Sequence, residues 1–184
     1  VPFYDQIQRT VVDLSDWFVR DGSTVYDLGS ATGETITRLL DKHRNKQDVH
    51  FVGIDNSRAM VHAARRKCPS SPAEFRCQDV ESVATFSNAD FVTALFTLQF
   101  LPVPRRHQLL RRVFRDLSEG SALVLVERVN AEHSSLESVW LQLYWDFKRR
   151  QGLTDEMILH KARSLRGVLC PLSQSQNIEL LQDV

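Results

Sequence analysis

The residues best suited to chemistry lie in one short stretch, where an acid and two glycines follow an apolar run. Asp27, Gly29 and Gly33 form the pattern D-x-G-x-x-x-G between the run 24–28 and a helical pattern over 33–43. Glycine lets the backbone turn tightly and approach a ligand, because a Cβ would hold the ligand away. This layout is typical of a strand that presents a loop to a nucleoside-bearing ligand.

The spacing of the glycines separates classes of loop. A dinucleotide fingerprint has three glycines in G-x-G-x-x-G, and a phosphate-binding P-loop ends in Gly-Lys-Ser/Thr. Residues 27–35 match neither pattern. The pattern that remains is that of S-adenosylmethionine (SAM) enzymes, where an amino-acid carboxylate, not a pyrophosphate, lies near the loop. The loop residues expected to bind SAM are Asp27, Gly29, Ser30, Ala31 and Gly33.

Two further acids follow the next two apolar runs. Asp55 follows the run 50–54, one βα unit past the glycine loop, where a carboxylate can bind both hydroxyls of a ribose. The alternative is that it caps the next helix. Asp79 follows the run 74–78 and can accept from an adenine amino group while the N–H of Val80 reaches a ring nitrogen. The alternative for Asp79 is a cap on the following turn. We favour cofactor binding for both acids.

Neighbouring side chains extend this candidate site. Met60 lies on the predicted helix 57–67. It is expected either to pack against the purine or to fill the core, and the sequence does not distinguish these two positions. The run 90–96 ends at the same edge of the sheet. Phe96, Thr97 and Gln99 are therefore candidates to line the cofactor or the substrate, although an aromatic residue there more often packs.

A parallel α/β sheet is needed to bring these residues together. Apolar runs predict strands over 24–28, 50–54, 74–78, 90–96 and 122–129. Helical spacing predicts helices over 3–18, 33–43, 57–67 and 104–117, the last closed by Glu119-Gly120. This alternation predicts a sheet of about five parallel strands with helices on both faces.

After residue 130 the pattern becomes helical, with helices predicted over 134–151, 154–165 and 173–181. We therefore expect one domain over 1–184, with an N-terminal helix in 1–23, the α/β core in 24–130 and a helical segment in 131–184. Within that segment Trp140, Tyr144, Trp145 and Phe147 form an aromatic cluster, expected in a substrate pocket, a homodimer interface or the core.

Composition limits the partners. Lys+Arg and Asp+Glu are both 23, so net charge gives no case for nucleic acid or an anionic membrane. Five arginines on the helix 104–117 are expected to form a solvated face, with a contact to RNA or to an acidic carrier as the alternative. No apolar run approaches the roughly 20 residues of a membrane span. Three scattered cysteines and isolated histidines predict a reducing, cytoplasmic setting and no metal site.

Several stretches carry a resemblance to a known family. They are 1–4, 25–29, 54–60, 96–101, 122–127 and 146–149 with Gly152. The chain resembles the class I SAM-dependent methyltransferases, and within them the carboxy-S-adenosyl-L-methionine synthase (CmoA) family. That family makes carboxy-SAM from SAM and prephenate for tRNA wobble-uridine modification. The resemblance implies cofactor contacts at Tyr4, 29–31, Asp55, Asn56, Asp79 and Val80.

Two departures from the family bear on the reaction. Leu95 stands where the family has a cofactor-contacting Asn. The family's late-helix Arg, which pairs with the extra carboxylate of carboxy-SAM, aligns with Leu180, and residues 174–184 contain no Arg. A buried carboxylate without its guanidinium is strongly penalised. We therefore expect plain SAM, methyl transfer and S-adenosyl-L-homocysteine as product. Carboxy-SAM synthesis and a non-catalytic SAM-fold assembly domain are the alternatives.

The resemblance also implies an antiparallel hairpin after the fifth strand. No strand pattern follows Val129, so we expect the hairpin to be missing from this chain or disordered, and the native protein to continue past Val184. The methyl acceptor, a small molecule or a carrier-bound intermediate, cannot be read from the sequence. No residue is predicted as a catalytic base.

Overall fold

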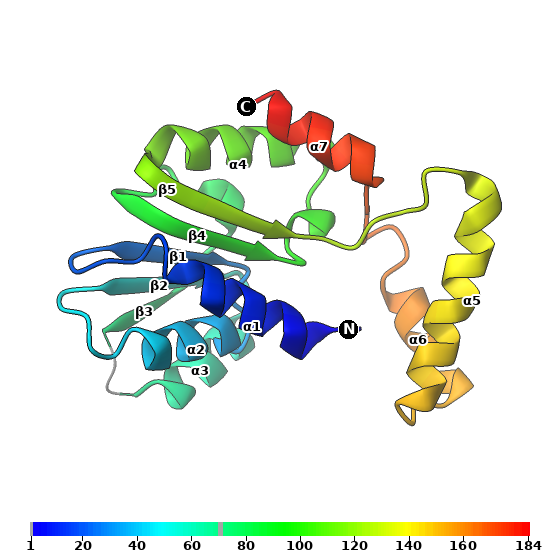
Figure 1. Ribbon diagram of the computed structural model, residues 1–184. Helices are drawn as coiled ribbons and strands as arrows, with labels where there is room; N and C mark the ends of the chain where they lie inside the picture. The colour runs from blue at the N-terminus through cyan, green and yellow to red at the C-terminus, as the bar shows by residue number, and fades with distance from the viewer. Residues whose placement is uncertain (1, 70–71) are drawn as a thin grey trace.

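A sheet of five parallel strands forms the centre of the molecule (Figure 1). The computed structural model describes residues 2–69 and 72–184, so Val1, part of the first stretch of the resemblance, lies outside the described residues. The strand order is β3-β2-β1-β4-β5. The strands are β1 (Thr24–Leu28), β2 (His50–Asp55), β3 (Ala73–Cys77), β4 (Ala89–Leu95) and β5 (Leu117–Val126). The predicted Rossmann-like class is confirmed, with the order reversing between β1 and β4.

Helices cover both faces of this sheet. In Figure 1, α1, α2 and α3 lie on one face and α4 and α7 on the other. Alternate strand residues point to opposite faces, so Val25 packs with the first set and Tyr26 with the second. The helices are α1 (Tyr4–Ser15), α2 (Glu34–Lys42), α3 (Arg58–Lys67), α4 (Val103–Asp116), α5 (Ser134–Arg150), α6 (Asp155–Ser164) and α7 (Gln174–Gln182), with short 3-10 turns η1 (Val80–Ser82) and η2 (Leu98–Phe100).

The fifth strand begins earlier than its hydrophobic run predicts. α4 ends at Asp116, because Leu117 is already extended with φ −65° and ψ 132°. The expectation that Glu119-Gly120 closes the helix is therefore wrong, since both residues lie within β5, where its register with β4 shifts. Gly120 has φ 75°, which suits such an irregularity. No strand follows β5 in the described ranges, and the hairpin beyond this chain stays a prediction.

The helical pair α5–α6 stands apart, beyond the ends of β4 and β5 (Figure 1). No residue of α5 is buried. The chain leaves the body at Asn130 and returns to it at Ser173, which bridges to Asn130, and α7 then inserts Leu180 into the core beside α4. No helix in the described part of the chain is long and apolar enough to cross a membrane.

Three of the five arginines of α4 are exposed as predicted, namely Arg105, Arg111 and Arg115, but Arg106 is buried. Arg106 is only 1% exposed, and its guanidinium donates to the carbonyls of Leu101 and Cys170. Arg112 donates to the carbonyl of Glu81 at 2.9 Å, and Arg115 pairs with Asp116 at 2.7 Å. The helix uses these charges to hold neighbouring backbone, so the solvated-face interpretation is wrong for Arg106.

Candidate functional site

The glycine loop after β1 is held in a conformation that needs glycine. Gly29 has φ 74°, and a Cβ there would lie 2.3 Å from Thr97 Oγ1. Gly33 has φ 76° at the start of α2, and a Cβ would meet Ala64 and Phe75 at 3.0 Å. Between them Ala31 has φ 44°, a left-handed conformation that costs a non-glycine residue energy. The loop is thus tightly packed and strained.

Four backbone donors of this loop are already used within the protein. The N–H groups of Gly29 and Ser30 donate to the carbonyl of Ile54 at 2.8 and 3.0 Å. Ala31 donates to Asp55 at 2.9 Å and Gly33 to the carbonyl of Ser30 at 2.8 Å. A phosphate-binding loop instead presents free N–H groups to its ligand. The loop geometry therefore disfavours a phosphate and agrees with the sequence interpretation.

A pocket of about 140 Å³ lies between the loop and α1. Its lining residues are Tyr4, Gln8, Asp27, Gly29, Ser30, Ala31, Thr32, Glu34, Thr35 and Leu95. Three of these carry buried polar atoms with no hydrogen-bond partner among the described residues: Gln8 Oε1, Asp27 Oδ2 and Ser30 Oγ. Because buried polar groups are nearly always paired in native proteins, these atoms mark a place for a polar ligand.

Asp27 is the charged group of this pocket. It is 2% exposed, and its other carboxylate oxygen accepts from Thr93 Oγ1 at 2.7 Å. Burial raises the pKa of Asp27 to about 6, and hydrogen bonds from Thr93 and Thr35 oppose that rise. A cationic ligand at the free oxygen would offset the cost of burying the carboxylate.

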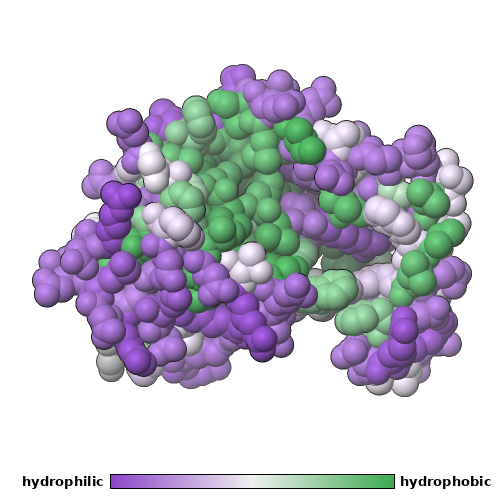
Figure 2. All heavy atoms as spheres, viewed as in Figure 1, coloured by the Kyte–Doolittle hydropathy of each residue, from purple (hydrophilic) through white to green (hydrophobic). Residues whose placement is uncertain are grey.

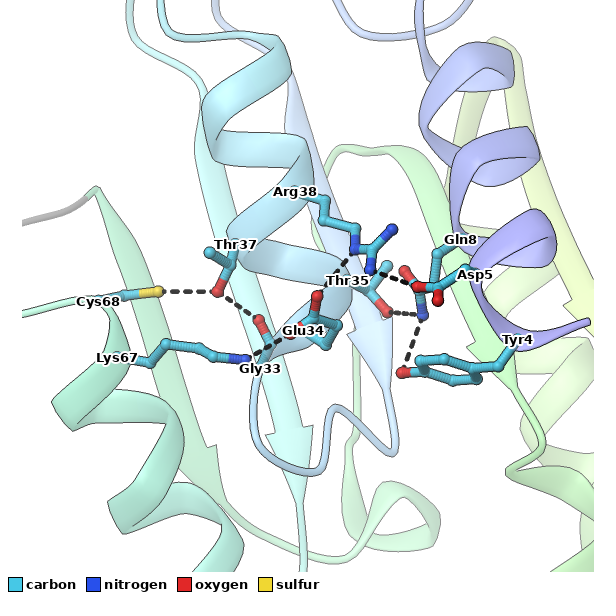
Figure 3. A network of polar contacts seen from close by, with 10 residues as sticks. All are labelled: Tyr4, Asp5, Gln8, Gly33, Glu34, Thr35, Thr37, Arg38, Lys67 and Cys68. Atoms are coloured by element: carbon cyan, nitrogen blue, oxygen red, sulfur yellow. Dashed lines mark hydrogen bonds and ion pairs between the residues drawn. The ribbon is translucent and has the colours of Figure 1, made fainter. Parts of the chain in front are cut away.

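The N-terminal helix covers one side of the pocket. Gln8 Nε2 donates to Tyr4 Oη at 3.2 Å and to Thr35 Oγ1 at 3.1 Å, which joins α1 to α2 (Figure 3). Arg38 pairs with both Asp5 and Glu34 at 2.8 Å in the same network. Burial raises the pKa of Tyr4, so its phenol stays neutral. Tyr4, which only the resemblance suggested, thus lies at the pocket.

Asp55 joins the end of β2 to the glycine loop. One carboxylate oxygen accepts from the N–H of Ala31 at 2.9 Å and the other from the N–H of Ser57 at 2.8 Å. Ser57 itself caps α3 by accepting from Met60. Ser57, not Asp55, is therefore the cap of α3, and each oxygen of Asp55 still has a lone pair for a further donor.

The other predicted contacts lie along the strand ends, outside the pocket lining. Asp79 accepts from the N–H of Glu81 at 2.9 Å, so the capping alternative is present for Asp79. Val80 is buried, Asn56 is exposed and Met60 is 42% exposed, which excludes Met60 as core filler. The structure groups these residues near the carboxyl ends of β2 and β3 without forming a closed pocket around them.

The turn after β4 is fixed by an acid that the sequence analysis did not single out. Phe96 has φ 59°, a left-handed conformation, and Glu127 accepts from the N–H groups of Leu98 and Gln99 at 2.7 and 3.1 Å. Burial raises the pKa of Glu127 to about 7, while these hydrogen bonds lower it. Thr97 Oγ1 donates to the carbonyl of Leu28 at 2.7 Å. Phe96 itself is half-buried and does not line the pocket.

Sequence reasoning missed four lining residues: Gln8, Thr32, Glu34 and Thr35. Thr32 lies inside the predicted loop and Glu34 in the first turn of the predicted helix 33–43, and neither has a distinguishing residue type. Gln8 follows Tyr4 by one helical turn, so its position was open to inference once Tyr4 was placed at the site. No group of three or more His, Cys, Asp or Glu side chains in the described ranges is arranged to hold a metal ion.

A larger groove, about 560 Å³, lies between α1 and the outer side of β5. Its lining is mostly apolar and includes Phe3, Ile7, Leu14, Val124 and Val126. Hydrophobic surface extends beside α1 in the centre of Figure 2. The groove has no charged lining residue, so it does not suit a charged cofactor.

The fold and the glycine loop define a class I SAM-dependent methyltransferase. Residues 25–120 match a protein family described as "Methyltransferase domain", which covers the core from β1 into β5. The YcgJ protein of Bacillus subtilis shares the fold with a TM-score of 0.64 at 18% identity, over 94% of this chain and 66% of that one.

Two similar proteins identify the family of this chain within the class I methyltransferases. A "Carboxy-S-adenosyl-L-methionine synthase" of Staphylococcus epidermidis is 36% identical over 99% of this chain and 78% of its own length. Another protein of that name, from Methylococcus capsulatus, is 32% identical over 99% of this chain and 76% of its own length. The chain belongs to the carboxy-S-adenosyl-L-methionine synthase family of SAM-dependent enzymes. Membership in an enzyme family removes the non-catalytic assembly domain from the alternatives.

Proposed function

We propose that the amino-acid end of SAM binds in the pocket between the glycine loop and α1. The supporting observation is the set of three unpartnered buried atoms, Gln8 Oε1, Asp27 Oδ2 and Ser30 Oγ. The SAM ammonium supplies N–H donors to Gln8 Oε1 and Asp27 Oδ2, and its positive charge offsets the negative charge of Asp27. About 140 Å³ suits one end of the cofactor, which leaves the adenosine to lie along the strand ends.

The adenosine contacts follow from the order of the strands. Asp55 retains lone pairs toward the ribose hydroxyls, and Asn56 lies beside it. Exposed Met60 is free to lie against the purine, and Asp79 with Val80 is assigned to its amino edge. Because the backbone hydrogen bonds of both acids leave lone pairs free, cofactor binding adds to these bonds without replacing them.

We propose methyl transfer from SAM to an acceptor that the structure does not identify, either a small molecule or a carrier-bound intermediate. Bound SAM supplies a sulfonium-activated methyl group, so the chain's main task is to position the acceptor in line with it. Tyr4 on α1 and Leu95 on β4 both line the pocket. The product is S-adenosyl-L-homocysteine.

Carboxy-SAM synthesis is the second candidate, and the names of the relatives support it at least as well. The chain's own residues favour methyl transfer over carboxy-SAM synthesis. Leu180, aligned with the family's arginine, is 7% exposed and packs in the core, and α7 contains no arginine. Leu95 adds an apolar side chain to the pocket lining. No other lining residue of the pocket is assigned to the extra carboxylate of carboxy-SAM.

One experiment separates the two reactions. The protein is incubated with SAM, with and without prephenate, and the nucleosides are resolved by mass spectrometry. The methyltransferase proposal predicts no carboxy-SAM in either sample. Formation of carboxy-SAM that depends on prephenate overturns the proposal and establishes the second candidate.

We further propose that a second copy of this chain covers α5. Five large hydrophobic residues of this helix are exposed, and Figure 2 shows hydrophobic surface on the α5 side of the molecule. They are Leu136, Val139, Trp140, Leu141 and Leu143. A self-complementary contact between two copies of one helix buries such a face twice, as in two-fold dimers. Of the predicted aromatic cluster, Trp140 belongs to this exposed face, whereas Tyr144, Trp145 and Phe147 are half-buried.

We also place the chain in the cytoplasm. Its three cysteines, Cys68, Cys77 and Cys170, are all free, and two of them are exposed. Exposed free thiols persist in a reducing compartment.

A further inference from the structure

The turn that follows β4 touches the cofactor pocket at two of the residues that line it. Thr97 Oγ1 donates to the carbonyl of Leu28 at 2.7 Å, directly before Gly29. The Thr97 side chain also fills the space that a Cβ of Gly29 would take. The carbonyl of Leu95, the last residue of β4, lies 3.3 Å from the same hydroxyl. Because Gly29 and Leu95 both line the pocket, a displacement of Thr97 displaces the pocket wall.

Glu127, directly after β5, holds this turn in place. Its two carboxylate oxygens accept from the N–H groups of Leu98 and Gln99 at 2.7 and 3.1 Å. Leu98 and Gln99 are buried, so an N–H group left there without an acceptor is costly. Hydrogen bonds to an ionised acceptor are also about twice as strong as those between neutral groups. The turn therefore depends on one carboxylate for two of its backbone donors.

The backbone is strained at the start of the same turn. Phe96 has φ 59°, a left-handed conformation that costs a non-glycine residue energy, and its N–H donates to the carbonyl of Val126 at 2.6 Å. A strained conformation persists only where the surrounding structure holds it. Without the hydrogen bonds to Glu127 the strain at Phe96 can relax, and this relaxation moves Thr97, the next residue.

We propose that Glu127 is a positioning residue for SAM, which acts through the η2 turn and Thr97 to hold the glycine loop and Leu95 in the shape that binds the cofactor. Glu127 is not among the described residues that line the pocket, so its effect on SAM passes through Thr97. The inference rests on the proposed function, because it requires the amino-acid end of SAM to bind in this pocket.

The test is a double-mutant cycle on SAM affinity, measured by calorimetry at pH 8, where the Glu127 carboxylate is ionised because its pKa is about 7. Glu127→Gln keeps the size of the side chain but turns an amide N–H toward one of the two backbone donors. It should weaken SAM binding about tenfold, the scale of one hydrogen bond to a charged group. Thr97→Ala, which removes the contact with the loop, should cause a similar loss. In the double variant Glu127→Gln should add less than about twofold, because Thr97 no longer transmits the displacement.

Glu132→Gln is the matched control. Glu132 also accepts a backbone N–H with one oxygen and a hydroxyl with the other, both from Ser175 at 2.8 Å, but it does so at the start of α7. This variant should leave SAM affinity unchanged. Thermal unfolding without SAM shows which variants are folded. If Glu127→Gln does not fold, Thr97→Ala and Thr97→Ser still test the proposal, since only the serine variant keeps the hydroxyl and should keep most of the affinity.

Three results would overturn the proposal. Glu127→Gln or Thr97→Ala binds SAM as tightly as wild type, or their two losses add in full in the double variant, as independent structural effects do. The third is an equal loss of affinity in Glu132→Gln. In each of these cases wild type still binds SAM and the proposed function stands. Absence of SAM binding to wild type overturns the proposed function together with this inference, so the two failures are distinguishable.

Discussion

At the scale of single residues, the site depends on a carboxylate that the protein buries and only half satisfies. Asp27 keeps one oxygen hydrogen-bonded to Thr93 and leaves the other without a partner. Such an arrangement is costly in the free protein and favourable once a cation arrives. The consequence is a cofactor affinity that depends on pH.

SAM affinity should rise with pH as Asp27 loses its proton. The pKa of Asp27 in the folded protein is about 6, so below pH 6 the proton must leave before the SAM ammonium can pair with the carboxylate. The affinity should fall by up to about tenfold per pH unit below that value. Asp27→Asn should bind more weakly at pH 7 and lose this pH dependence. Calorimetry between pH 5 and 7 checks this, and an equal slope in Asp27→Asn contradicts it.

Gly29→Ala should lower the free energy of unfolding by more than the cost of placing an alanine in the left-handed conformation of Gly29. The left-handed φ costs an alanine roughly 1–2 kcal/mol, and overpacking against Thr97 adds roughly 1–3 kcal/mol. Gly22→Ala is the control, because Gly22 has φ 77° and a Cβ there meets nothing within 4 Å. Urea unfolding compares the two variants. Equal losses would show that the contact with Thr97 contributes nothing.

At the scale of elements, the end of β4 is held by one residue at the end of β5. Glu127 fixes the η2 turn through two backbone N–H groups, while Thr97 of the same turn packs against Gly29. The turn therefore couples the edge strand to the glycine loop. Strain at Phe96 and Ala31 lies on the two sides of this contact.

Glu127 should make stability fall as pH rises from about 4.5 to about 7. Its pKa is raised from 4.5 to about 7 in the folded protein, so within this window the folded state holds a proton that the unfolded state has released. The free energy of unfolding then declines by at most about 1.4 kcal/mol per pH unit for one proton. Glu127→Gln lacks this contribution.

The measurement is urea unfolding of wild type and Glu127→Gln at several pH values. The difference in unfolding free energy should move in favour of the variant as pH rises. A difference that is constant from pH 4.5 to 7 means that Glu127 does not titrate in this window.

The elements were largely predictable from sequence because apolar runs and helical spacing are local patterns. The failures had non-local causes. The pair Glu119-Gly120 predicts the end of a helix, but both residues lie in β5, which pairs with β4. The helical pattern predicts Arg106 at the surface, yet its side chain is buried and donates hydrogen bonds to the carbonyls of Leu101 and Cys170. Cys170 is 64 residues away, and no local pattern indicates that contact.

The site was predictable where it follows the ends of strands and less so where another element covers it. Asp27 and the loop were placed by spacing alone, whereas Gln8 enters from α1 and Glu127 from β5. Tyr4 came only from the resemblance. Whether Asp79 and Met60 contact adenine stays a prediction.

At the scale of the whole molecule, the exposed face of α5 should set the oligomeric state. We expect wild type to be a dimer, and Leu143→Glu, which places a charge at a residue 57% exposed in one chain, to be monomeric. Phe114→Glu on α4 is the control, because Phe114 is 63% exposed and lies far from α5 along the chain. Light scattering with size exclusion checks this. A monomeric wild type overturns the dimer.

Calorimetric titration of SAM decides whether the acids at the strand ends bind one SAM molecule. Asp90→Ala is the matched control, since Asp90 accepts from the N–H of Thr24 at the opposite edge of the sheet. We predict saturable binding to wild type and Asp90→Ala, and an affinity for Asp55→Ala weaker by about 1–3 kcal/mol. Absence of binding to wild type, or an unchanged affinity in Asp55→Ala, would show that these acids do not hold SAM.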